Sequence, residues 1–248
     1  MKSIDVCMAT YNGELYLGRQ IYSIINQTEL VDRVIISDDA SRDSTVAAIE
    51  RIACSEIEVI ANKENLGHVG NFERAISRSS ADIVFLSDQD DVWMANKVEV
   101  VMRIFEMNPE VVMVHHNLTT MNEGGDLLRE SYVPLHPEGV QSSVDFILRE
   151  FFKPRLFGCA MAFRRNILDV LLPFPSCVYA HDHWISVVSA FMGNIYFLDE
   201  NLVLYRQHGN NLTPKIRRSL SSIIKSRFIF AQMIVYAFIR SRRLGRLK

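Results

Sequence analysis

Residues 83–91 read IVFLSDQDD: four apolar side chains, one serine, and then three carboxylates within four residues. A short run that is apolar at every position is typical of a strand buried on both faces, as in parallel sheets. Clustered carboxylates repel one another unless a cation or another positive group lies nearby. The stretch therefore predicts a buried strand that ends either in a cation-binding loop or in a solvated acidic turn.

The same strand pattern recurs three times before this stretch, at residues 4–9, 33–37 and 57–61. Amphipathic patterns at residues 15–26, 44–53 and 69–77 separate these runs and predict helices. The alternation predicts an α/β fold of the Rossmann-like kind, with a mostly parallel sheet flanked by helices. Ligands bind such sheets at the carboxyl ends of the strands. The distinctive polar segments follow the strands at those ends, at residues 10–13, 38–39, 62–67 and 88–91.

The second half of the chain is less regular. We expect helices at residues 97–107, 144–152 and 167–172, strands at 111–115, 195–198 and 202–205, and a glycine-rich turn at 122–126. No repeat or low-complexity linker divides the sequence. We therefore expect one catalytic domain over residues 1–214, followed by a distinct basic tail over residues 215–248.

Composition and the N-terminus place the protein in a broad class. The 248 residues are 48% hydrophobic and 23% charged, an ordinary composition for a globular domain. The four cysteines are scattered, without metal-ligand spacing, which indicates reduced thiols. The apolar run after Lys2 is too short for a signal peptide, so we expect a cytoplasmic protein.

The tail carries ten Lys or Arg and no Asp or Glu, whereas the preceding residues carry 17 basic and 29 acidic side chains. Its uncharged run at residues 228–239 is shorter than the ~20 residues needed to cross a bilayer. Apolar residues flanked by cations predict a helix on an anionic membrane surface. The alternative is a helix packed on the enzyme or on a second subunit. The acidic body argues against nucleic acid as a partner, and the sequence sets no oligomeric state.

Four segments occur in a characteristic order: MATYNGE at residues 8–14, SDDASRDST at 37–45, NKENLGHVGNF at 62–72 and FLSDQDDVW at 85–93. Together they resemble the GT-A glycosyltransferases of family 2, over about the first 210 residues. FLSDQDDVW and YRQHGNN, at residues 205–211, are similar to rhamnosyltransferase-like members. The resemblance implies an inverting transfer of a sugar from a nucleotide-diphosphate donor, with Mn²⁺ or Mg²⁺ as the cofactor.

The resemblance also implies roles for single residues. Ala9 and Tyr11 would flank the nucleotide base, and Asp39 would accept its ring N–H. Asp88 would contact the ribose, and Asp90 would hold the metal on the diphosphate, with His208 completing the metal shell. For Asp91, we expect the role of capping a helix that runs through Trp93. The expected nucleotide-sugar site comprises Ala9, Thr10, Tyr11, Asn12, Glu14, Asp38, Asp39, Asn65, Gly67, Asp88 and Arg206.

On the acceptor side, an inverting transfer needs a general base that takes the proton of the attacking hydroxyl. The resemblance assigns this role to Asp182 and acceptor contacts to Gly158, Cys159 and Trp184. One alternative makes Asp182 a structural carboxylate, and another makes His181 and His183 metal ligands on one face of a strand. For residues 205–211, which carry Arg206 and His208, the alternative to a place in the donor and metal sites is a surface turn.

The sequence thus predicts a transferase that acts at the cytoplasmic face of the membrane. The expected acceptor is a saccharide attached to a lipid, in the synthesis of a bacterial surface polysaccharide. dTDP-rhamnose is the first donor candidate, with UDP-galactose and UDP-glucose still open. Two alternatives remain. A nucleotidyltransferase would need a glycine-rich phosphate loop with cations after the first strand, which residues 9–14 lack. A membrane-docked protein that binds sugar nucleotides without catalysis would need no general base.

Overall fold

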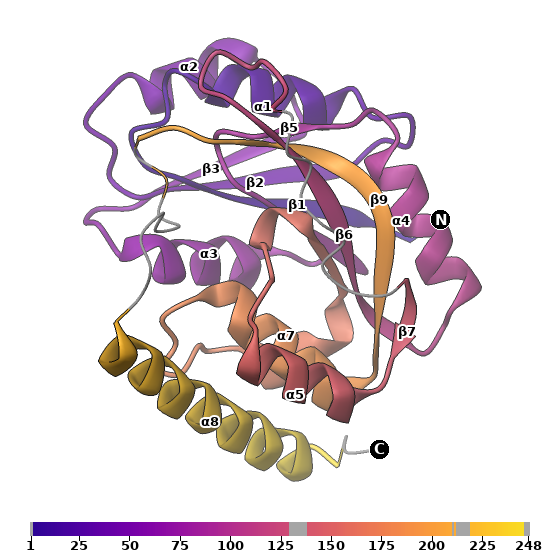
Figure 1. Ribbon diagram of the computed structural model, residues 1–248. Helices are drawn as coiled ribbons and strands as arrows, with labels where there is room; N and C mark the ends of the chain where they lie inside the picture. Colours follow the sequence, from indigo (N-terminus) through magenta and orange to yellow (C-terminus); the bar gives the residue numbers. More distant parts are fainter. Residues whose placement is uncertain (1, 129–137, 210, 212–218, 246–248) are drawn as a thin grey trace.

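The computed structural model of the protein describes residues 2–128, 138–209, 211 and 219–245. Within these residues, a single sheet of nine strands has helices on both faces (Figure 1). The strand order is β3-β2-β1-β4-β8-β6-β9-β5, and β7 pairs with β9. The expected α/β fold with a helix-flanked sheet is confirmed. Asn210 and five of the tail's cations, Lys215, Arg217, Arg218, Arg246 and Lys248, lie outside the described residues.

The first half of the chain forms the parallel part of the sheet, as the alternation predicts. Strands β1, β2, β3 and β4 all run in the same direction. Their elements in chain order are β1 (Ile4–Thr10), α1 (Leu17–Ile25), β2 (Arg33–Asp38), α2 (Thr45–Ile52), β3 (Ile57–Ala61), α3 (Gly67–Arg78) and β4 (Ile83–Ser87). The carboxyl ends of these strands therefore share one edge of the sheet.

The second half mixes directions. Strand β8 joins β4 to β6 through two antiparallel pairs, whereas β6 and β9 run parallel. The elements are β5 (Val92–Trp93), α4 (Lys97–Met107), β6 (Val111–Met121), β7 (Gly139–Gln141), α5 (Ser143–Phe152), η1 (Gly158–Ala160), β8 (Met161–Arg164), η2 (Arg165–Ile167), α6 (Leu168–Leu171), α7 (His181–Met192), β9 (Asn194–Arg206) and α8 (Leu220–Arg243). The sheet is thus mixed where the sequence predicts mostly parallel strands.

The expected helix through Trp93 is not formed. Val92 and Trp93 form the short strand β5, antiparallel to Leu204 and Val203 of β9, and α4 begins only at Lys97. The two strands expected at residues 195–198 and 202–205 are one strand, β9. Its pairing with β6 shifts register between His116, which pairs with Leu198, and Asn117, which pairs with Asn201. Asp199 and Glu200 are therefore accommodated within one strand.

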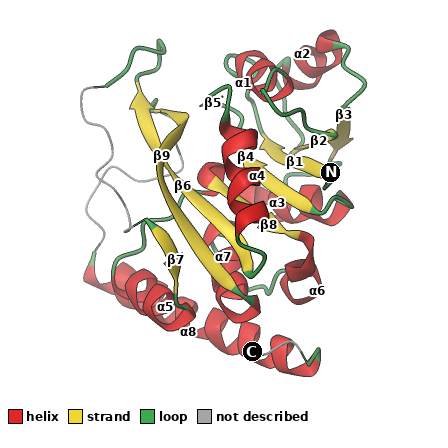
Figure 2. Ribbon diagram, turned by 90° about the vertical axis from the view of Figure 1, so that its right-hand side faces the viewer, coloured by secondary structure: helices red, strands yellow, loops and turns green. Residues whose placement is uncertain are grey.

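Apolar side chains fill two layers, one on each face of the sheet. Helices α1 and α4 contribute Leu17, Ile21, Val98 and Phe105 to one layer. Helices α3, α5, α7 and α8 supply the other layer, which includes Phe72, Phe146, Trp184, Phe230 and Met233. Figure 2 shows this second group of helices on the side of the sheet opposite α1.

The described part of the tail, residues 219–245, contains the helix α8, which packs on α6 and α7. Phe230, Met233 and Ala237 are buried, and the Arg240 guanidinium donates to the carbonyl oxygens of Val170 and Pro173 at the end of α6. By length and composition alone, α8 is the one described helix that is long and apolar enough to cross a membrane. Only 17% of the most apolar 18-residue stretch of α8 is buried among the described residues, so most of this helix is exposed.

Candidate active site at the carboxyl ends of the strands

The loops that follow β1 and β4 are joined by a reciprocal pair of hydrogen bonds. The Tyr11 backbone N–H donates to Gln89 Oε1 at 2.8 Å, and Gln89 Nε2 donates to the Tyr11 carbonyl oxygen at 3.1 Å. Gly13 makes this contact possible, since a Cβ at Gly13 would lie 2.3 Å from Gln89 Oε1. Gln89 therefore holds the acidic loop against the end of β1, a role that nothing in the sequence indicates.

The Asp90 carboxylate meets His208 from the far end of the chain. Asp90 Oδ2 lies 2.7 Å from His208 Nε2, and the His208 ring stacks on Tyr16 with centroids 5.2 Å apart. Both side chains of the pair are largely but not completely enclosed. The two residues expected to bind the metal are thus brought together, 118 residues apart in sequence.

Arg206 fastens this corner of the site. Its Nε donates to the Asp90 carbonyl oxygen at 2.8 Å, its Nη1 to the Glu123 carbonyl oxygen at 2.8 Å, and its guanidinium lies over the Tyr16 ring. Because the side chain is buried and bonded to backbone oxygens, it is not free to pair with a phosphate. Arg206, which was expected in the nucleotide-sugar site, therefore has a structural role in this arrangement.

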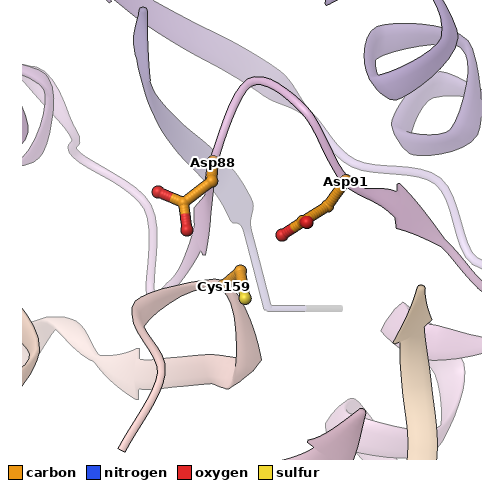
Figure 3. Close-up of side chains that lie close together, drawn as sticks. All are labelled: Asp88, Asp91 and Cys159. Carbon is orange, nitrogen blue, oxygen red and sulfur yellow. The ribbon is translucent and has the colours of Figure 1, made fainter. Parts of the chain in front are cut away.

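Asp88, Asp91 and Cys159 form a second acidic group beneath the loop (Figure 3). Their ligand atoms all lie within 4.8 Å of one another, and Figure 3 shows Asp88 and Asp91 on the loop facing Cys159 of η1. Burial, followed by the charge of Asp90, raises the pKa of Asp91 to about 7. One oxygen of Asp91 accepts the Arg206 backbone N–H at 3.0 Å, so Asp91 anchors β9 and does not cap a helix.

Lys97 places a buried ammonium beside this group. Its Nζ donates to the Cys159 carbonyl oxygen at 2.7 Å and lies 3.7 Å from the centroid of the Trp93 ring. Burial lowers the pKa of Lys97 to about 7, against the attraction of Asp91 and Asp88. The sequence gives no signal for this role, because a lysine at the start of an amphipathic helix is ordinarily solvated.

A divalent cation fits the pair Asp90 and His208 better than the group with Cys159. A carboxylate oxygen and an imidazole nitrogen that converge from two loops are donors that Mn²⁺ accepts. Burial, followed by the charges of Asp91 and Asp88, raises the pKa of the Cys159 thiol well above its usual value, and a sulfur ligand is softer than Mn²⁺ or Mg²⁺ prefers. The charged form of Lys97, which lies beside the second group, would repel a cation there.

Asp182 lies at the start of α7, in the first turn of a helix and not on a strand. A carboxylate in the first turn is stabilised by the positive end of the helix dipole. One of its oxygens accepts the His183 backbone N–H at 2.7 Å, and the side chain is only half buried. Asp182 also contributes to raising the pKa of Asp88, after burial, Asp91 and Asp90. The structure therefore brings Asp182 close to the acidic loop.

The histidines that flank Asp182 are not a metal site. His181 is buried against the ring of Phe72, with centroids 3.9 Å apart, and burial lowers its pKa to about 4. His183 Nδ1 bonds the Tyr179 hydroxyl at 2.8 Å. Residues two apart on a helix do not share a face, so the reading of both histidines as ligands on one face of a strand is wrong.

Trp184 does not contact an acceptor in this arrangement. Its ring is fully buried, and its Nε1–H donates to the Leu171 carbonyl oxygen at 2.9 Å. The expected acceptor contact is therefore corrected to a core role. Gly158 packs against the His181 ring, since a Cβ there would lie 2.4 Å from Nε2, and Cys159 is buried below the acidic loop. Acceptor contacts by Gly158 and Cys159 stay predictions.

The end of β2 holds loops together. Thr10 Oγ1 donates to Asp38 Oδ1 at 3.0 Å, and Asp38 also accepts from the backbone N–H and hydroxyl of Ser41. Both side chains are buried and shape the loops of the site, and their contacts with a nucleotide stay predictions. Asn12 and Glu14 are exposed and accept backbone N–H groups of Arg42 and Ser44, which ties the loop after β1 to the start of α2.

Asp39 organises the loop that carries Asn65 and Gly67. Its oxygens accept the backbone N–H groups of Leu66 at 2.7 Å and Gly67 at 2.9 Å, and Asn65 Nδ2 donates to the Asp39 carbonyl oxygen at 3.2 Å. Gly67 has φ of 74°, a conformation that favours glycine. Ala9 in β1 is partly buried, and Tyr11, directly after β1, is exposed. Contacts of these residues with a nucleotide stay predictions.

Comparisons with known proteins agree with this geometry. Residues 5–172 match the family described as Glycosyl transferase family 2. An uncharacterized glycosyltransferase of Nostoc sp. is 28% identical over 217 residues, which cover 84% of this chain and 66% of the relative. The dTDP-rhamnosyl transferase RfbG of Shigella flexneri is 26% identical over 224 residues, 82% of this chain and 72% of the relative.

Among solved structures, TarS 1–349 of S. aureus in complex with UDP-GlcNAc superposes with a TM-score of 0.72 at 16% identity, over 96% of this chain and 72% of TarS 1–349. At that identity the likeness concerns the fold, which is the GT-A fold that the sequence predicts. The chain spans about two thirds of the length of the Nostoc relative. The match to the family covers well over half of the chain, including β1 to β4 and the acidic loop. The chain belongs to glycosyl transferase family 2.

Proposed function

We propose that the chain transfers a sugar from a nucleotide-diphosphate donor to a saccharide acceptor, with inversion at the anomeric carbon, in the synthesis of a bacterial surface polysaccharide. One observation carries the proposal. The loop after β4 carries Asp88 and Asp90, and α7, nearly a hundred residues later, begins beside it with Asp182, whose charge adds to burial, Asp91 and Asp90 in raising the pKa of Asp88. Parallel sheets bind nucleotides at this edge.

The chemistry would divide between the two sides of this convergence. Asp182 would accept the proton of the attacking hydroxyl as its oxygen forms a bond to the anomeric carbon and the bond from that carbon to the diphosphate breaks. Asp90 and His208 would hold a divalent cation, Mn²⁺ or Mg²⁺, which when bound neutralises the charge of the leaving diphosphate. Gln89 would keep the acidic loop in place for both the donor and the acceptor.

dTDP-rhamnose is the first donor candidate. One support is the relative RfbG, which is named a dTDP-rhamnosyl transferase. The other is the segment FLSDQDDVW, which resembles rhamnosyltransferase-like members of the family. UDP-galactose and UDP-glucose remain candidates. The proposed acceptor is a saccharide attached to a lipid, and the proposed location is the cytoplasmic face of the membrane, both supported by the largely exposed apolar helix α8.

A donor screen followed by one substitution tests the proposal. Thermal unfolding with Mn²⁺ should show stabilisation by one nucleotide sugar and not by the others, because a ligand that binds only the folded state stabilises it. Asp182→Asn should bind that donor as the native chain does, yet lose about 10²- to 10⁴-fold in turnover. The exposed α4 residue Glu106 provides the control Glu106→Gln, which should change neither property. Native turnover by Asp182→Asn would remove the assigned base.

A further inference from the structure

Two apolar stripes lie exposed on neighbouring helices. On α5, Val144, Leu148 and Phe152 are spaced by four residues and are between 51% and 69% exposed. On α8, Leu220, Ile224 and Phe228 have the same spacing and are between 66% and 79% exposed. Residues four apart share one face of a helix, so each set forms a continuous stripe. Apart from the ring of Phe151, which lies edge-on to Phe152 at 5.2 Å, these side chains are largely exposed among the described residues.

The two helices meet where these stripes end. Arg227 Nη2 donates to the Phe152 carbonyl oxygen at 2.9 Å, and the rings of Phe151 and Phe230 lie 6.1 Å apart. Figures 1 and 2 both show α5 beside α8 on the outer side of α7. The contact joins a helix of the catalytic domain to the tail helix, so the apolar surface is not confined to the tail. Monomeric proteins seldom expose this much contiguous apolar surface without a partner.

The charges around the stripes narrow the kind of partner. Arg149, Lys153 and Lys225 are exposed next to stripe residues, and Arg242 and Arg243 are exposed at the other end of α8. The exposed carboxylate on α5, Asp145, lies in the first turn of the helix and accepts a hydrogen bond from the Ser142 hydroxyl, so the exposed cations on the two helices outnumber it. Apolar side chains flanked by cations match a bilayer that carries anionic headgroups, which offers hydrocarbon and negative charge together. A purely apolar protein partner would gain nothing from the cations.

We propose that the exposed faces of α5 and α8 together form one surface that binds an anionic lipid bilayer. The proposal rests on the proposed transfer to a lipid-linked acceptor and adds α5, and with it the catalytic domain, to the membrane contact. The surface lies close to the assigned base. His183, the residue after Asp182, has its ring 6.0 Å from that of Phe230 on α8. Because Phe230 lies on the buried side of α8, Asp182 would then lie at least one helix diameter, ~10 Å, from the bilayer.

Vesicle flotation of the full chain tests this surface. The native chain should float with phosphatidylcholine vesicles that contain phosphatidylglycerol and much less with phosphatidylcholine alone, and about 0.5 M NaCl should weaken the binding. The triple variant Val144→Ser, Leu148→Ser, Phe152→Ser should lose roughly a hundredfold in vesicle partition, because three apolar side chains no longer enter the bilayer. Because the three positions are exposed, the variant should retain the fold, and thermal unfolding checks this.

The matched control replaces equally exposed apolar residues elsewhere, as Leu15→Ser, Leu30→Ser, Met107→Ser, and should float like the native chain. Native flotation by the α5 variant would overturn the proposal, as would a native dimer in light scattering that this variant converts to a monomer. Mn²⁺-dependent donor stabilisation, measured on the same samples, separates the two proposals. Its presence with failed flotation refutes only the membrane surface, and its absence refutes the proposed function.

Discussion

Replacing Gly13 by alanine should destabilise the protein through Gln89. A Cβ at Gly13 would lie 2.3 Å from Gln89 Oε1 and 2.7 Å from its Cδ, so the amide group must move. Moving it breaks the two hydrogen bonds to Tyr11 that join the loops after β1 and β4. Each is worth about 1 kcal/mol net, and the stiffer unfolded chain returns about 0.5 kcal/mol. The expected loss is therefore about 1.5 kcal/mol, a fall of roughly 3–6 °C in Tm.

A double-mutant cycle measures whether Gln89 is the cause. Urea unfolding of the native chain, Gly13→Ala, Gln89→Ala and the double variant gives the four free energies of unfolding. Gln89→Ala removes both the clash and the hydrogen bonds, so adding Gly13→Ala to it should cost almost nothing. Gly18→Ala is the control: its Cβ would meet nothing within 4 Å, and the substitution should stabilise α1 by about 0.5–1 kcal/mol. An equal cost of Gly13→Ala in both backgrounds would refute the reasoning.

The remaining predictions concern the metal pair and a buried histidine. Asp90→Ala should abolish Mn²⁺-dependent donor binding, and unchanged binding in titration calorimetry would reject the pair Asp90 and His208. Burial lowers the pKa of His181 from 6.5 to about 4, so its contribution to stability is complete above pH 6.5 and is lost as the pH falls towards 4. Between pH 7 and pH 5 the native chain should lose about 2 kcal/mol more than His181→Asn in urea unfolding; equal losses would contradict this pKa.

The tail requires a finer experiment than its removal. Deleting residues 219–248 would test membrane binding by the tail alone, but α8 buries Phe230, Met233 and Ala237 against the catalytic domain. Its loss would expose apolar surface on α7 and change stability together with any membrane binding. Substitutions on the exposed faces of α5 and α8 separate the two effects.

Local sequence determined the parallel half of the fold. Each of β1 to β4 is a short, largely apolar run rich in β-branched residues and bounded by turn residues, and this shortness and composition, together with periodicity, separate the runs from the helices between them. Because parallel strands point the same way, the polar residues that follow them must share one edge of the sheet. The location of the candidate site was therefore predictable before any contact was known, as was the closeness of Asp90 to the residues after β1.

The identity of the groups that build the site needed the tertiary structure. Val92 and Trp93 form a strand because β9, more than 100 residues later, offers them a partner. Arg206 binds carbonyl oxygens and Trp184 fills the core because of what surrounds them, although each residue type also suits a ligand. Gln89 and Lys97 act through distant backbone atoms and leave no periodic trace in the chain. Periodicity records which face of an element is apolar, whereas the partner of a polar side chain depends on contacts that only folding creates.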